Sequence, residues 1–155
     1  MQRGCKTSVL CESVAKRLRE HGFKCHGISV TIRDKNLFTF TRQKKLTRST
    51  QLTNAITKEA YSLFLQNYNL EKNPPVRALT VSTFDLRDEN ECFQLDLFDD
   101  PAKLDNSEKL NHAIDSLQSR FGTACIKRAF LLKDQSLTSF DPYEKHIIHP
   151  VPYFK

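Results

Sequence analysis

The sequence has no apolar run of the roughly 20 residues that a membrane-spanning helix needs. Its first residues lead into no apolar stretch of secretory-signal length, so we expect neither a membrane contact nor export. None of the 5 cysteines forms a Cys-x-x-Cys pair, and the 5 histidines show no metal-ligand spacing. We therefore expect reduced thiols in the cytoplasm and no metal site.

Motifs of enzymatic chemistry are also absent. There is no Gly-x-Ser-x-Gly, no glycine-rich phosphate loop and no His-Glu-x-x-His. Asp99 and Asp100 are adjacent, but Pro101 follows them, which is typical of a solvated loop. We expect no catalytic residue. Tryptophan is missing, yet 11 Phe and 4 Tyr argue against disorder, and 155 residues suffice for a substantial core.

Charge is divided unevenly along the chain. Residues 1–86 hold 15 Lys and Arg against 6 Asp and Glu, a net charge of +9. Residues 87–155 hold 9 against 12, a net charge of −3. The first half therefore indicates a polyanionic partner, and the second half does not.

Hydrophobic periodicity predicts helices over 8–22, about 53–70 and 106–121, and strands over 27–34, 37–43 and 76–84. Ser8 is a plausible cap for the first helix and Thr53 or Asn54 for the second, and Gly22 fits the stop of the first. On the third helix we expect one apolar face formed by Leu110, Ala113, Ile114, Leu117 and Phe121. Residues 34–36 read as a turn, 85–93 as a polar loop, 124–132 as a short strand and 138–155 as an extended tail.

The predicted strands pair into a sheet with one apolar and one polar face. Ile28, Val30 and Ile32 alternate with polar residues, so they point towards the helices. The other face would carry Ser29, Thr31, Arg33, Thr39, Thr41, Thr80 and Ser82, with Arg42, Lys44, Lys45 and Arg48 at its edge. Small hydroxyl side chains admit a phosphate backbone, and cations release its counterions, so this face predicts nucleic-acid binding. An ordinary solvated sheet face has a similar composition, and this alternative stays open.

The acidic segment after the last predicted strand contains Gln94-Leu95-Asp96-Leu97-Phe98. Leaving Leu97 and Phe98 in water is unfavourable by roughly 1.5–3 kcal/mol each relative to full burial. An exposed linker with this apolar pair is a candidate peptide anchor for a partner protein. The alternative is that the pair ties the linker down onto its own domain.

Five segments, taken in order, resemble the C-terminal part of a Y-family translesion DNA polymerase of the UmuC-like branch. They are residues 14–23, 38–42, 75–82, 94–98, and 113–115 with 120–122. The first three are similar to the little-finger helix and strands, and the fourth is similar to the peptide by which bacterial polymerases bind the sliding clamp. The last resembles the segment that follows this peptide.

The resemblance implies an α+β fold in which two helices pack on one face of an antiparallel sheet, followed by a linker peptide and a C-terminal helical extension. We expect a DNA-binding domain over residues 1–86, a linker with the clamp-binding peptide over 87–105, and a helix and tail over 106–155. Carried over by position, the DNA-facing residues are Arg33, Thr39, Thr41, Arg42, Arg77, Thr80 and Ser82, and the clamp anchors are Gln94, Leu95, Leu97 and Phe98. Arg77 shares the side of Leu79 and Val81, so it reaches DNA only where its strand meets the end of the sheet.

The family's palm, with its Mg²⁺-binding carboxylates, has no counterpart in this sequence, nor does the strand that precedes the first helix. We therefore expect no cofactor in this chain. The expected partners are damaged duplex or primer-template DNA, the sliding clamp and the missing N-terminal polymerase part. The expected function is DNA binding and clamp tethering for lesion bypass in an SOS-type response. Two alternatives are a regulator that occupies the clamp without engaging DNA, and an inert remnant of a truncated polymerase gene.

Overall fold

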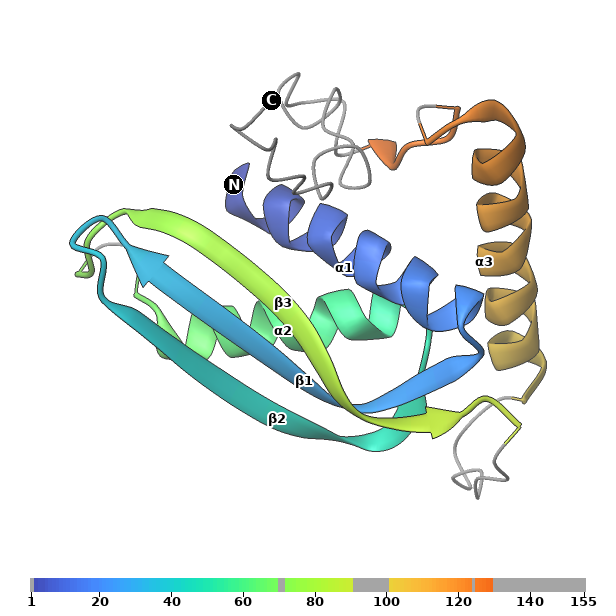
Figure 1. The fold of residues 1–155 in the computed structure, drawn as a ribbon, viewed down its shortest axis with the longest axis horizontal. Coiled ribbons are helices and arrows are strands. Elements are labelled where there is room, and N and C mark those ends of the chain that lie inside the picture. The colour runs from blue at the N-terminus through green and yellow to red at the C-terminus, as the bar shows by residue number, and fades with distance from the viewer. Residues whose placement is uncertain (1, 70–71, 91–100, 124, 130–155) are drawn as a thin grey trace, which may run out of the picture.

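The structure is a computed structural model that describes residues 2–69, 72–90, 101–123 and 125–129. Its elements are α1 (Gln2–Glu20), β1 (Phe23–Asp34), β2 (Thr39–Thr50), α2 (Thr53–Asn67), β3 (Val76–Asp88) and α3 (Pro101–Phe121). Within these residues, three strands form an antiparallel sheet in the order β2-β1-β3, and α1 and α2 lie against one of its faces (Figure 1). The predicted α+β arrangement is confirmed.

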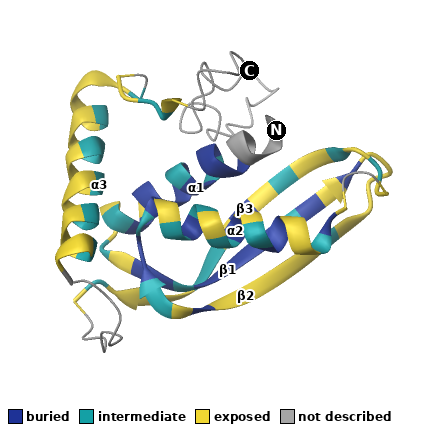
Figure 2. Ribbon diagram, turned by 180° about the vertical axis from the view of Figure 1, so that it is seen from behind, coloured by how far each residue is buried: buried dark blue, intermediate teal, exposed yellow. Residues whose placement is uncertain are grey.

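The core lies between the sheet and these two helices. Ile28, Val30 and Ile32 of the central strand are at most 1% exposed, as their alternation predicts. The buried bands of α1 and α2 face them (Figure 2). From α2 the core receives Ile56, Ala60, Leu63 and Phe64, and just beyond it Tyr68, at the spacing of one helix face.

The regular alternation of β1 breaks near its start. Cys25 belongs to the same core as Ile28, although the two residues are an odd number of positions apart. Between Cys25 and Gly27 the register with β2 shifts. A Cβ built on Gly27 would lie 2.3 Å from the ring of Phe84, so glycine is what lets this ring cross β1. Next to Phe84, Asp85 has a φ of 54°. The backbone of β3 is therefore irregular beside the register shift of β1.

Helix starts were predicted less well than helix stops. The α1 helix already includes Ser8, so the cap assigned to Ser8 is wrong. The N-cap of α2 is Leu52 without a side-chain cap, so the choice of Thr53 or Asn54 is wrong as well. Gly22 and Gly122 follow their helices with φ values of 67° and 87°, as expected of glycine stops.

The third strand is longer than the sequence predicts. It continues to Asp88, so the loop predicted over 85–93 is wrong for its first four residues. The extra length of β3 is explained by strand pairing. β1 begins at Phe23, and this residue pairs with Asp88 of β3. The amide of Glu89 then donates to the carbonyl of Gly22 over 2.9 Å. The strand expected over 124–132 is not present in residues 125–129, which are the described part of that range.

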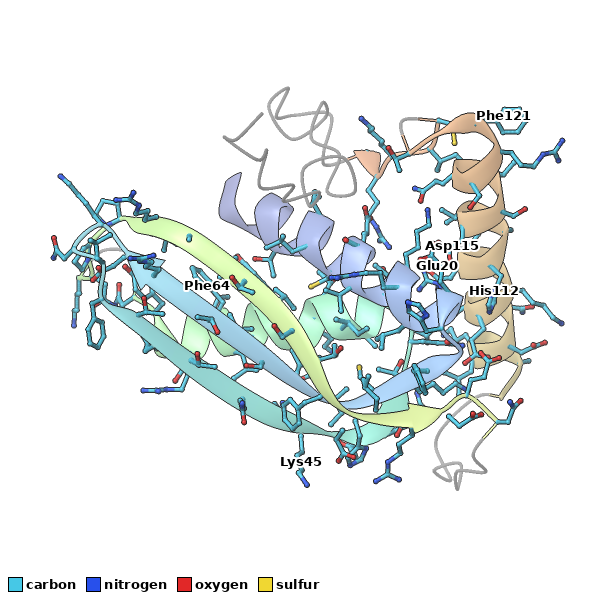
Figure 3. The ribbon with its side chains drawn as sticks, in the orientation of Figure 1. Glu20, Lys45, Phe64, His112, Asp115 and Phe121 are labelled. Carbon is cyan, nitrogen blue, oxygen red and sulfur yellow. The ribbon has the colours of Figure 1, made fainter. Side chains whose placement is uncertain are left out.

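Helix α3 lies against the C-terminal half of α1, and polar contacts hold it there (Figures 1 and 3). The Arg19 guanidinium, whose side chain is 5% exposed, donates to both carboxylate oxygens of Asp115 at 2.5 and 3.0 Å. Lys24 and Glu108 add a pair at 3.7 Å. The predicted apolar face of α3 is only partly the docked one: Ile114 is half-buried and lines the groove towards α1, whereas Leu110 is 61% and Phe121 is 65% exposed. The rest of this face points to solvent because polar side chains such as Asp115 also occupy the docked side.

Candidate nucleic-acid interface

The face of the sheet away from α1 and α2 carries aligned rows of hydroxyl side chains. Strand register places Thr31 of β1 between Thr41 of β2 and Thr80 of β3. The hydroxyls of Thr31 and Thr41 are 2.8 Å apart and share a hydrogen bond. The next row places Ser29 opposite Ser82. Three strands thus present short polar side chains at one level, which leaves space for a phosphate backbone to approach the sheet.

The residues of this polar face differ in their exposure to solvent. The exposed members of the predicted set on this face are Arg33, Thr39, Thr41, Lys45, Thr80 and Ser82. Thr31 is half-buried, and Ser29 is 8% exposed because it lies on the central strand. We call these eight residues the polar sheet face. Gln43, which pairs with Ser29, lies on it too and was missed by sequence reasoning.

Two of the predicted cations lie on the opposite side of the sheet. Arg42 pairs with Val30, and Lys44 pairs with Ile28, so both share the helix-covered side with these buried partners. Lys44 Nζ lies 2.6 Å from a carboxylate oxygen of Glu59 in α2. The structure therefore separates them from the polar sheet face.

Arg42 illustrates how a strand cation is retained by a helix. Its Nε donates to Asn67 Oδ1 of α2 at 3.2 Å, and its guanidinium lies 5.2 Å from the ring centre of Phe40. Such cation–π contacts are worth about 0.5–1 kcal/mol at exposed sites. The DNA role assigned to Arg42 and Lys44 stays a prediction, and it would require both side chains to leave these contacts.

Of the other predicted cations, Lys45 belongs to the polar sheet face and Arg77 lies at its end. Lys45 projects away from the body of the domain (Figure 3), and its side chain is 73% exposed. Its nearest carboxylate oxygen, from Asp85, is 3.9 Å away, a separation at which a solvated pair contributes little. Arg77 is exposed next to the register shift between Arg33 and Asp34, at the end of the sheet. This is where the sequence predicted that Arg77 could reach a ligand.

The four predicted clamp anchors Gln94, Leu95, Leu97 and Phe98 lie outside the described residues. Within residues 2–69, 72–90, 101–123 and 125–129, no three His, Cys, Asp or Glu side chains are placed to hold a metal ion together. In the same part of the chain, no helix has the length and apolar character that a bilayer crossing requires.

Taken together, the fold and the site define a small α+β domain that offers a basic, hydroxyl-rich sheet face on the side opposite its helices. The comparison with known families agrees. Residues 6–97 match the model of the impB/mucB/samB family C-terminal domain. The chain therefore belongs to this family, which confirms the resemblance to the C-terminal part of Y-family polymerases.

Three curated relatives illustrate the similarity. "DNA polymerase IV" of Acetivibrio thermocellus is 40% identical over 129 residues, covering 83% of this chain and 32% of the relative. "DNA polymerase IV" of Clostridium acetobutylicum is 31% identical over 127 residues, covering 82% and 31%. "DNA polymerase IV 2" of Halalkalibacterium halodurans is 30% identical over 123 residues, covering 77% and 28%. The chain spans about a third of the length of these relatives. The UmuC-like branch stays a prediction.

Proposed function

We propose that this chain is a DNA-binding and clamp-tethering module of an error-prone, lesion-bypass DNA polymerase. The observation that carries the proposal is the polar sheet face, with Thr31, Thr41 and Thr80 aligned across three strands and Arg33 and Lys45 exposed beside them. Such a face fits a phosphate backbone without reading base sequence. DNA polymerase relatives and the cytoplasmic setting expected from the sequence support the same function.

The parent enzyme's chemistry is assigned to the palm, not to this chain. Two Mg²⁺ ions held there would promote nucleotidyl transfer. Here the contribution is to retain the polymerase on damaged primer-template DNA. The N-terminal polymerase part is a further proposed partner. A groove between α1 and the outer edge of β3, lined by Val14, Leu18, Val81 and Leu86, supports such a contact.

DNA binding is tested by removing two cations from the polar sheet face. We expect Arg33→Ala with Lys45→Ala to weaken duplex binding. The slope of log K against log salt concentration should fall by about 2, or about 1 for each phosphate that is no longer bound. Fluorescence anisotropy at several salt concentrations measures both quantities.

The matched control is Lys58→Ala with Lys109→Ala, which removes the same charge from the exposed outer sides of α2 and α3. It should retain the wild-type slope. Salt-independent wild-type binding, or an equal loss in the control, would show that the polar sheet face does not hold phosphates.

The clamp tether is tested separately from DNA binding. Leu97→Ala with Phe98→Ala should abolish binding to a purified bacterial sliding clamp and leave duplex affinity unchanged, because a peptide anchor acts independently of the sheet. Surface plasmon resonance with each partner measures the two affinities. If the double variant unfolds instead, the pair belongs to the domain's own core. A regulator that only occupies the clamp would not engage DNA, so loss of Arg33 and Lys45 would spare its function, whereas the same loss would harm a DNA-binding module.

A further inference from the structure

The turn between β1 and β2 exposes two large apolar side chains in succession. We call residues 34–38 the hairpin tip. Leu37 is 49% exposed and Phe38 is 65% exposed, at the end of the sheet remote from α3 (Figure 1). The ring of Phe38 is supported from one side by Phe40, with ring centres 6.1 Å apart. Scattered apolar residues are common on protein surfaces, but an adjacent pair at a projecting turn is characteristic of a contact surface.

The hairpin tip is held in a strained conformation by several hydrogen bonds. Leu37 has a φ of 68°, which is unfavourable for a bulky residue. Asp34 holds this geometry, since its carbonyl accepts from Leu37 N at 3.2 Å and its carboxylate accepts from Phe38 N at 2.9 Å. Lys35 N also donates to the Pro75 carbonyl at 2.9 Å, which fixes the tip to the start of β3. A tip fixed in this way loses little conformational entropy when it binds a partner.

The surroundings of the hairpin tip are strongly basic. Arg33, Lys35 and Arg77 are all exposed at this end of the sheet. Within residues 33–38 and 72–77, Asp34 is the single acid, and it is buried beneath the turn. The tip is also continuous with the polar sheet face, because Arg33 pairs with Thr39. An apolar pair flanked by cations fits a duplex groove, because apolar side chains can wedge against sugars and base steps there while cations bind the phosphates on either side.

We propose that Leu37 and Phe38 act as an apolar wedge that contacts sugars and base edges in a groove of duplex DNA. The surrounding cations would bind the phosphates on either side. This inference rests on the proposed DNA-binding function and adds a second kind of contact to it. Phosphate contacts position a protein on DNA, whereas apolar wedges add affinity where they meet the bases.

The test is duplex binding by the full 155-residue chain carrying Phe38→Ser. We expect affinity for a labelled primer-template duplex to fall on the order of tenfold, the size typical of removing one aromatic side chain from a nucleic-acid interface. The salt slope should stay unchanged, because every phosphate-binding cation is still in place. Phe121→Ser is the matched control: Phe121 is also 65% exposed, but it lies on α3, and its loss should leave affinity unchanged.

Leu37→Gly separates binding from folding. Glycine accepts the positive φ of this position without strain, so the variant should melt no lower than wild type and still bind DNA more weakly. Wild-type affinity in both tip variants would overturn the wedge. The DNA-binding function would nevertheless stand if Arg33→Ala with Lys45→Ala still reduced the salt slope. A reduced slope in Phe38→Ser would also overturn the wedge, because the tip would then act only by positioning cations. No duplex binding by the wild-type chain would overturn both proposals.

Discussion

Two buried thiols link the stability of the domain to pH. Burial raises the pKa of Cys11 to about 12 and that of Cys25 to about 11, from the ordinary value of 9.0. Above pH 9 the unfolded chain therefore loses protons that the folded chain retains. The stabilisation that these two thiols contribute is complete below pH 9. It is lost as pH rises towards about 11 to 12, so the free energy of unfolding falls over this range.

This pH effect can be measured by urea unfolding at pH 7.5 and at a pH near 10. We expect wild type to lose on the order of 3 kcal/mol more than Cys11→Ala with Cys25→Ala, since each of the two thiols contributes about 1.4 kcal/mol per pH unit above 9.0. Cys125→Ala is the control, because that thiol is exposed. Equal losses in wild type and the buried-thiol variant would contradict the expectation.

At the scale of elements, the better buried of the two ion pairs that join α3 to the rest of the domain is Arg19–Asp115. Asp115→Ala would leave the Arg19 guanidinium with the carbonyl of Gln51 and the hydroxyl of Thr53 as its acceptors. We expect the docking of α3 to weaken by about 1–3 kcal/mol, the usual result of depriving a buried polar group of a partner. Hydrogen exchange should then speed up in α3 and stay unchanged in β1.

Asp105→Ala provides the comparison on the same helix. Its pair with Lys109 is exposed at 58% and 72%, so its loss should change exchange in α3 by no more than the small effect of a surface pair. Equal exchange in the two variants would show that the Arg19–Asp115 pair does not hold the helix.

The sequence predicted the elements that depend on local pattern. The alternation of Ile28, Val30 and Ile32 identifies β1, and the spacing of Ile56, Ala60 and Leu63 identifies α2, because each pattern has the period of its element. The docked side of α3 could not be found in this way. Its decisive contact joins residues 96 positions apart, and no period encodes such a partner.

The same limit applies to the candidate site. Thr31, Thr41 and Thr80 were predicted on one face because strand alternation follows directly from the sequence. Arg42 and Lys44 were placed at the edge of that face, although their parity already matched Val30 and Ile28 across β1. Their partners on α2 became visible only with the helix in position. The close approach of Phe84 to Gly27 was not predicted. A glycine inside a strand often marks such close packing, so the sequence did contain an indication of it.

At the scale of the whole molecule, the hydrophobic core is complete without α3. The described core cluster draws its residues from α1, α2, the residue that follows α2, and the three strands. We therefore expect a chain that ends at Asn90 to unfold in a single cooperative transition, at a lower temperature than the full chain because it lacks the Arg19–Asp115 pair. Circular dichroism on heating measures this, since a chain with 0 Trp has no tryptophan fluorescence to follow. A gradual, non-cooperative loss of signal would mean that α3 is part of the cooperative unit.

The length of the central strand sets a distance between two proposed contacts. β1 has 12 residues, and the eleven steps from Phe23 to Asp34 at the hairpin tip extend about 36 Å at about 3.3 Å per step. Phe23 is paired with Asp88, so the chain leaves the sheet towards the proposed clamp peptide at the end opposite the tip. One turn of duplex DNA measures about 34–36 Å. Where the sheet follows the duplex axis, the tip and the exit of the chain would therefore meet the same side of the double helix, one turn apart.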